Sequence, residues 1–176
     1  MTPALLIIDM LNDFISGPLK TPEAQATVDP ARRLLLWART RSMPIFYAND
    51  AHFPADREIS LWGAHAMAHT AGAQVVEALA PAAEDIVLDK HAYSAFFGTP
   101  LDMLLRRRHI DSVILCGLDA DICVRHTSAD AYFLNYHIFV AQDAVAARLD
   151  PNWQVYYQKV YHAQVQTVAE IISHLS

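Results

Sequence analysis

Three side chains that could together perform covalent acyl transfer each follow a separate apolar run of the chain, and they are Asp9, Lys90 and Cys123. A thiol in the first turn of a helix and near an ammonium group has a lowered pKa, and its thiolate is the nucleophile. A carboxylate can accept the thiol proton and return it to a leaving amine. The residue types therefore predict that Cys123 attacks, Asp9 transfers the proton and Lys90 activates the thiol.

Backbone amides could complete this site. Free N–H groups around Gly117-Leu118-Asp119 and at Cys123 could bind the oxyanion of a tetrahedral intermediate. Each side chain also has an ordinary interpretation. A lone cysteine is more often a buried small apolar residue, an aspartate at a strand end can cap a turn, and a lysine can pair with a surface carboxylate. We assign no role to Cys116.

A second group of polar residues follows another apolar run. Asp50 and His52 flank Ala51, and Glu58 and His65 follow in the same connection. Two imidazoles with one or two carboxylates suit a divalent transition metal such as Zn²⁺, Fe²⁺ or Mn²⁺. The loose spacing leaves a second interpretation open, a polar loop whose imidazoles cap backbone groups. We expect no organic cofactor.

Aromatic residues in the same connections could form the walls of a pocket for a flat substrate. They are Phe14, Trp62, Tyr93, Phe96 and Phe97. The alternative for each of them is an ordinary place in the core.

Apolar runs of strand length alternate with helical patterns, which is typical of a parallel sheet covered on both faces. The predicted strands are 4–8, 44–48, 85–88, 113–116, 137–141 and 164–167. The predicted helices are 30–41 with Asp29 as N-cap, 74–80, 100–108, 121–135, one that begins at Asp150-Pro151, and 169–175. The long connection 51–72 is predicted to lack regular structure.

These elements predict an α/β fold, a doubly wound three-layer sandwich with a six-stranded, mostly parallel sheet, in a single domain over residues 1–176. Ligands of such sheets bind beyond the carboxyl ends of the strands. This topology is what brings Asp9, Asp50, Lys90 and the segment before Cys123 to one edge.

Composition excludes several classes of protein. The chain has 176 residues, of which 53% are hydrophobic and 18% charged, so a globular domain is expected. The net charge is −6 and no basic run is longer than 106–108, which argues against nucleic-acid binding. The first apolar run stops at Asp9 without a positive segment before it, so we expect neither a signal peptide nor a membrane span. Two cysteines read as free thiols indicate a cytoplasmic protein.

Several ordered motifs resemble one family, the isochorismatase-like cysteine hydrolases, whose best-known members are the nicotinamidases. The matching pieces are Leu6-Ile7-Ile8-Asp9-Met10, Asn12-Asp13-Phe14, Lys90 with Tyr93-Ser94-Ala95-Phe96 and Gly98-Thr99, Gly117-Leu118-Asp119-Ala120-Asp121-Ile122-Cys123-Val124, Thr127, Asp130-Ala131 and Asp143-Ala144. The resemblance covers most of the chain, from Leu5 to about Ala146.

The resemblance implies a triad of Asp9, Lys90 and Cys123, a cis peptide before Asp119, and an oxyanion hole from the amides of Asp119 and Cys123. It implies a metal on Asp50, His52 and His65 with Glu58 as a fourth group, and Trp62 as a pocket wall. It also implies a homo-oligomer, a dimer or a tetramer. Leu11, Ala120 and His69 depart from the family pattern, and Asp119 is an unusual acid that could disfavour a thiolate or bind a substrate amine.

The resemblance favours hydrolysis of a small amide, nicotinamide above others, to an acid and ammonia through a thioester. Three alternatives stay open. They are a metal-independent relative that acts on ureido, carbamoyl or other small amides, a non-catalytic small-molecule binding protein, and a redox-active thiol protein.

Overall fold

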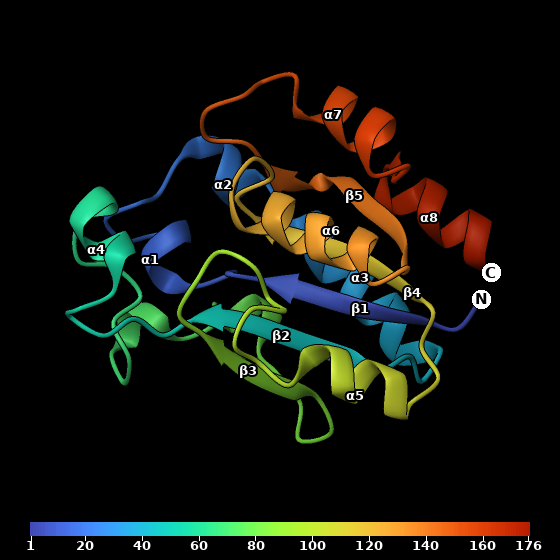
Figure 1. The fold of residues 1–176 in the computed structure, drawn as a ribbon, viewed down its shortest axis with the longest axis horizontal. Coiled ribbons are helices and arrows are strands. Elements are labelled where there is room, and N and C mark those ends of the chain that lie inside the picture. The colour runs from blue at the N-terminus through green and yellow to red at the C-terminus, as the bar shows by residue number, and fades with distance from the viewer.

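The computed structural model describes residues 1–176 and contains one sheet of six parallel strands (Figure 1). The order of the strands is β3-β2-β1-β4-β5-β6, and every neighbouring pair is parallel. The strands are β1 (Pro3–Ile8), β2 (Ile45–Asp50), β3 (Ile86–Lys90), β4 (Ser112–Leu118), β5 (His137–Ala146) and β6 (Gln164–Gln166). The predicted α/β fold with a six-stranded sheet is confirmed.

Helices cover both faces of the sheet. Those on one face are α1 (Asn12–Ile15), α2 (Pro22–Ala26), α3 (Val28–Thr40) and α8 (Val168–Leu175), and those on the other are α5 (Leu101–Arg107), α6 (Cys123–Phe133) and α7 (Trp153–Val160). Successive residues of β1 point into opposite cores, because side chains alternate along a strand. Leu5 and Ile7 pack with the α3 side, and Leu6 and Ile8 with the α5 and α6 side.

The connection after β2 differs from its prediction. A helix, α4 (Arg57–Trp62), lies within the segment that the sequence predicts to be irregular. The segment 74–80 is not a helix: only a 3₁₀ turn at Glu77–Leu79 forms, and Val75 pairs with Leu11 in an isolated bridge. A second 3₁₀ turn covers Ala71–Ala73.

Other observed element boundaries also differ from the predicted ones. The short helices α1 and α2 are not foreseen, and α3 begins directly after α2, so Asp29 lies in its first turn and is not the N-cap. Strand β5 runs to Ala146, past its predicted end, with a register shift against β4 between Leu115 and Gly117. No helix of the chain has the length and apolar character needed to cross a bilayer.

The carboxyl ends of the strands meet at one edge of the sheet, where α1 and α4 also lie (Figure 1). Asp50 and Lys90 are paired in register at the ends of β2 and β3. Gly117 packs against β1 so closely that a Cβ atom there would lie 1.9 Å from the carbonyl oxygen of Ile8, and its φ is +116°. Only glycine fits this position. The peptide bond between Leu118 and Asp119 is cis, as the resemblance implies.

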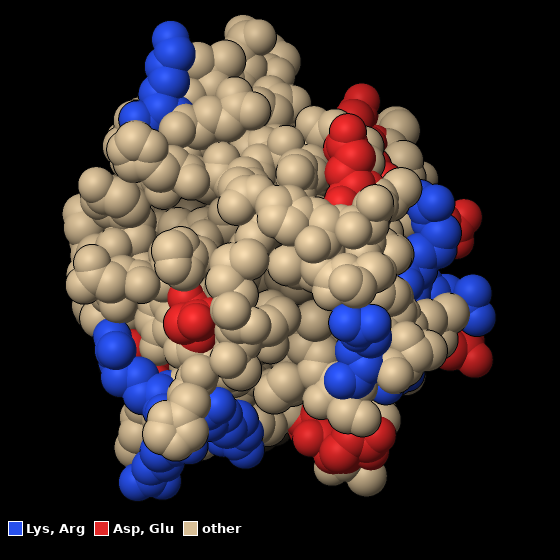
Figure 2. All heavy atoms as spheres, turned by 90° about the vertical axis from the view of Figure 1, so that its right-hand side faces the viewer, with Lys and Arg blue, Asp and Glu red and all other residues tan.

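The opposite edge carries no broad basic surface. Figure 2 shows this face, where Lys and Arg side chains form separate groups near the rim with Asp and Glu between them.

Candidate active site

Lys90 lies between two buried carboxylates. Its Nζ is 2.8 Å from Oδ2 of Asp9 and 2.5 Å from Oδ1 of Asp50. The backbone N–H of Asp50 donates to Oδ1 of Asp9 over 2.7 Å. All three side chains are inaccessible to solvent or nearly so. A buried ammonium flanked by two carboxylates is stable only as a complete set, because removal of one partner leaves an uncompensated charge.

Cys123 is the first residue of α6 and lies beside this ionic group. Its side chain is buried, and its Sγ lies within 4.8 Å of carboxylate oxygens of both Asp9 and Asp50. The structure therefore brings together the three residues that the sequence predicts as a set.

The expected lowering of the thiol pKa is wrong. Burial raises the pKa of Cys123 well above its ordinary value, and Lys90 offsets this only in part because Asp9 and Asp50 also raise it. Burial and the charge of Asp50 raise the pKa of Asp9 to about 7, against the effect of Lys90. The resting residue is thus a neutral thiol next to a carboxylate of unusually high proton affinity.

The amides of Asp119 and Cys123 make no hydrogen bond to another backbone group. The neighbouring amides of Ile122 and Val124 both donate to the carbonyl oxygen of Asp119, which fixes the turn before α6. The two unpaired N–H groups are therefore available to a ligand, since buried amides without a partner are rare.

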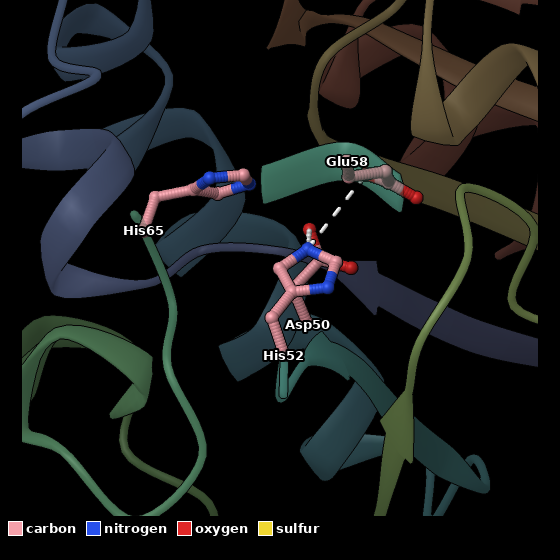
Figure 3. A group of neighbouring side chains, drawn as sticks. All are labelled: Asp50, His52, Glu58 and His65. Atoms are coloured by element: carbon pink, nitrogen blue, oxygen red, sulfur yellow. Dashed lines mark ion pairs between the residues drawn. The ribbon is translucent and has the colours of Figure 1, made fainter. Parts of the chain in front are cut away.

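The predicted metal-binding residues also converge. Asp50, His52, Glu58 and His65 each offer one ligand atom, and these atoms lie within 4.8 Å of one another (Figure 3). Nε2 of His52 is 3.4 Å from Oδ2 of Asp50 and 3.7 Å from Oε2 of Glu58. Both Nε2 of His52 and Oδ2 of Asp50 are buried without a hydrogen-bond partner. Two imidazoles and two carboxylates, among which Nε2 of His52 and Oδ2 of Asp50 are orphaned and face one another, fit a divalent transition metal.

Charge in this group is balanced by protons. Burial disfavours the cation at His52, but the nearby carboxylates of Asp50, Asp56 and Glu58 raise the pKa of His52 to about 9. Burial and the charge of Asp50 raise the pKa of Glu58 to about 7, and burial lowers the pKa of His65. A metal ion at this position would replace protons, as ligand sets of this kind require.

Cys123 and three residues of the metal group, Asp50, Glu58 and His65, line one small cavity. Its lining residues are Phe14, Leu19, Asp50, Glu58, Trp62, His65, Tyr93, Asp119, Ile122, Cys123 and Arg148. The indole N–H of Trp62 donates to the hydroxyl of Tyr93 over 3.0 Å, which holds two aromatic walls together.

Two of the predicted wall residues lie elsewhere. Phe96 is not among the lining residues and stacks on Tyr136 with 5.8 Å between the ring centres. Phe97 is 71% exposed. The expectation that Phe96 forms a wall is therefore wrong, because its side chain packs beside the core of the α5 face.

Arg148 is a cavity residue that the sequence analysis missed. It follows β5, its Nε is 2.6 Å from Oδ2 of Asp119, and its Nη2 donates to the carbonyl oxygen of Leu19 over 2.9 Å. Burial raises the pKa of Asp119, partly offset by Arg148. A signal was present, since Arg148 follows a predicted strand at the ligand-binding edge, but the predicted strand ended too early to bring it there.

Comparison with known proteins identifies one family of hydrolases. A family model described as "Isochorismatase domain" matches residues 3–174. The structure of N-carbamoylsarcosine amidase from Thermoplasma acidophilum is similar, with 54% identity, 96% of this chain and 97% of that chain covered, and a TM-score of 0.94. Nicotinamidase of Escherichia coli is 33% identical over 80% of this chain and 81% of its own length. Pyrazinamidase of Pyrococcus horikoshii, solved in complex with zinc, is 25% identical over 95% of this chain and 99% of its own, with a TM-score of 0.84.

Proposed function

The chain belongs to the isochorismatase domain family of hydrolases, and on that premise we propose that it hydrolyses a small nicotinamide-like amide to an acid and ammonia through a thioester on Cys123. The observation that carries this proposal is one cavity lined by Cys123 together with Asp50, Glu58 and His65. The Asp9–Lys90 pair contacts the same group of side chains, and His52 completes the set of four metal-binding candidates. Family membership by itself supports small-amide hydrolysis without naming the substrate.

In the first half of the reaction the thiol of Cys123 gives its proton to Asp9 and the sulfur attacks the amide carbonyl. The developing oxyanion accepts hydrogen bonds from the backbone N–H groups of Asp119 and Cys123. The C–N bond then breaks as Asp9 returns the proton to the amine nitrogen. Ammonia leaves, and the acyl group stays on sulfur.

In the second half a water molecule attacks the thioester while Asp9 accepts one of its protons. The C–S bond breaks, the acid leaves, and the proton on Asp9 restores the thiol. Asp9 suits both transfers because its pKa is raised to about 7, near the operating pH. Lys90 keeps Asp9 oriented and compensates its charge in both halves.

The donor set of Asp50, His52, Glu58 and His65 would hold a divalent transition metal. When bound, such an ion supplies a Lewis-acid position for a ring nitrogen or a water molecule. The chain's own residues provide the remaining recognition. Phe14, Trp62 and Tyr93 line the cavity, and such walls suit a flat ring.

A second candidate is a carbamoyl amide that carries a carboxylate, and Arg148 is the observation that favours it. Two of the five N–H donors of the Arg148 guanidinium are used, by Asp119 and by the carbonyl oxygen of Leu19, and Arg148 lines the cavity. The similar structure from Thermoplasma acidophilum is named as an amidase of such a compound. The ion pair between Arg148 and Asp119 weakens this candidate, because the carboxylate of Asp119 already neutralises the charge that would attract a substrate carboxylate.

Ammonia release separates the candidates. The purified protein is assayed with nicotinamide and with N-carbamoylsarcosine, before and after chelation. Release from nicotinamide that chelation stops supports the first candidate. Preferred release from N-carbamoylsarcosine supports the second, and no release from either compound or from a panel of small amides contradicts the proposal.

The proposal includes a single domain over residues 1–176, a reducing cytoplasmic compartment and a homo-oligomer. The family match over residues 3–174 supports the first part, and two buried free cysteines support the second. Exposed apolar side chains support the third, with Phe133 at 72% and Leu149 at 70% exposure.

A further inference from the structure

We propose that Asp56 is a positioning residue of the metal site, which holds the ring of His52 with Nε2 toward Asp50 and Glu58 and so sets the affinity for a divalent transition metal. The inference rests on the metal part of the proposed function and is independent of which amide is hydrolysed.

Asp56 is held in place by its own turn. Its Oδ2 accepts the backbone N–H of Phe53 over 2.9 Å, and its N–H donates to the carbonyl oxygen of Phe53 over 3.0 Å. The same Oδ2 lies 3.1 Å from Nδ1 of His52, and the carboxylate is 17% exposed. A carboxylate anchored by the backbone gives the imidazole a fixed partner.

This contact decides which nitrogen of His52 faces the cluster. An ionised carboxylate only accepts hydrogen bonds, so Nδ1 must carry the proton. The lone pair of the neutral ring is then on Nε2, which is buried, has no hydrogen-bond partner and lies 3.4 Å from Oδ2 of Asp50. Figure 3 marks the ion pairs of this ring with Asp50 and Glu58. A carboxylate on the outer nitrogen also makes the ligating nitrogen more basic.

The second imidazole of the group is held differently. Nδ1 of His65 is 2.8 Å from the carbonyl oxygen of Gly63. A backbone partner fixes the orientation of that ring, but no side-chain substitution removes it. Asp56 is therefore the outer contact whose contribution to metal affinity can be measured.

The test compares zinc affinity in the full chain with Asp56→Asn and Asp56→Ala, by competition with a chromogenic chelator. We expect the alanine variant to lose affinity by about 10- to 100-fold and the asparagine variant to lose less, because its amide oxygen still accepts from Nδ1. Thermal unfolding without metal checks that both variants are folded.

Asp85→Asn is the matched control. Asp85 likewise accepts the N–H of the residue three positions earlier, Ala82, over 2.8 Å, and pairs with a cation, Arg39, over 2.9 Å. It lies just before β3, at the edge of the sheet opposite the metal group. The zinc affinity of the Asp85→Asn variant should equal that of the unmodified chain.

A spectroscopic measurement separates positioning from general stability. Long-range ¹H–¹⁵N NMR of the zinc-loaded chain should show the His52 proton on Nδ1, and Asp56→Ala should change this pattern or the visible spectrum of the Co²⁺-loaded chain. Unchanged affinity in Asp56→Ala, or an equal loss in Asp85→Asn, would overturn the inference. An unmodified chain that binds no zinc but still releases ammonia would overturn it as well, and would leave the amidase proposal intact.

Discussion

At the scale of single residues, Lys90 links the two parts of the site, the catalytic pair of Asp9 and Cys123 and the group of candidate metal ligands. It contacts Asp9, which faces Cys123, and Asp50, whose second oxygen faces His52. The residue types and their places after strands predicted that Asp9, Lys90 and Cys123 lie together, but not that Lys90 also pairs with Asp50. The sequence could not reveal the electrostatic balance, because burial is a property of the folded chain, and it raises the pKa of the Cys123 thiol where a lowered value was expected.

Lys90→Ala should destabilise the protein, because it leaves Asp9 and Asp50 buried without their cation. We expect the free energy of unfolding in urea to fall by about 3–5 kcal/mol. Lys159→Ala, at an exposed position, should change it by about 0.5 kcal/mol or less. Equal stability of both variants would show that Lys90 does not compensate these carboxylates.

The two cysteines should differ completely in their effect on activity. Cys116 is buried within β4 with its pKa raised to about 12 by burial, and it does not line the cavity. Cys123→Ala should lower kcat for the amide by at least roughly 10³-fold, as removal of a nucleophile does, and Cys116→Ala should leave kcat nearly unchanged. Steady-state ammonia release measures both, and comparable activity of the two variants would argue against a covalent mechanism.

At the scale of elements, short segments between the strands hold the site. Asn12 and Asp13 of α1 bind the connection that carries His65: Nδ2 of Asn12 donates to the carbonyl oxygen of Ala71, and Oδ2 of Asp13 accepts from the N–H of Ala66, both over 2.8 Å. Strands could be predicted because fully buried strands are continuous apolar runs. Helices of four to six residues, such as α1, α2 and α4, could not, because tertiary contacts rather than periodicity define them.

Asp121 should be the residue that fixes the segment carrying Arg148. Its carboxylate accepts the backbone N–H groups of Arg148 over 3.0 Å and of Asp150 over 2.7 Å, and that of Leu149 between them. Asp121→Asn should lower the free energy of unfolding by about 1.5–3 kcal/mol, because hydrogen bonds to a charged acceptor are lost.

The same variant should raise KM for the amide more than it lowers kcat. Arg148 lines the cavity, so its displacement should weaken substrate binding, whereas the groups near the sulfur of Cys123 are Asp9 and Asp50. Glu84→Gln, at an exposed position, is the control for loss of a carboxylate. Unfolding curves and initial rates of the two variants test this, and identical behaviour would contradict the role of Asp121.

At the scale of the whole molecule, the strand order explains why distant residues meet. The chain starts at β1, winds outward to β3 on one side, and then returns to β4 beside β1. Open sheets bind ligands where the winding direction reverses, and here Asp9 follows β1 and Cys123 follows β4 at that point. The sequence predicted that the groups share one edge, but the order of strands, and with it the neighbours of each residue, came only from the structure.

If the proposed metal site is correct, zinc should stabilise the entire fold, because the proposed ligands come from β2 and from the connection after it and are assembled only in the folded state. At a zinc concentration about 100 times the Kd, the free energy of unfolding should rise by about 2.7 kcal/mol. His65→Ala should lose this gain, and His162→Ala, at an exposed position outside the site, should keep it. Calorimetry with and without zinc measures the difference, and a gain retained in His65→Ala would place the metal elsewhere.

The covalent intermediate tests the central claim most directly. The protein is mixed with nicotinamide and, in a parallel experiment, with N-carbamoylsarcosine, and each reaction is quenched in acid during turnover. The protein is then digested, and the masses of its peptides are measured by mass spectrometry. We predict an acyl group on the peptide that contains Cys123, none on Cys116, and none in Cys123→Ala. Sustained ammonia release from Cys123→Ala without any acylated peptide would contradict the account.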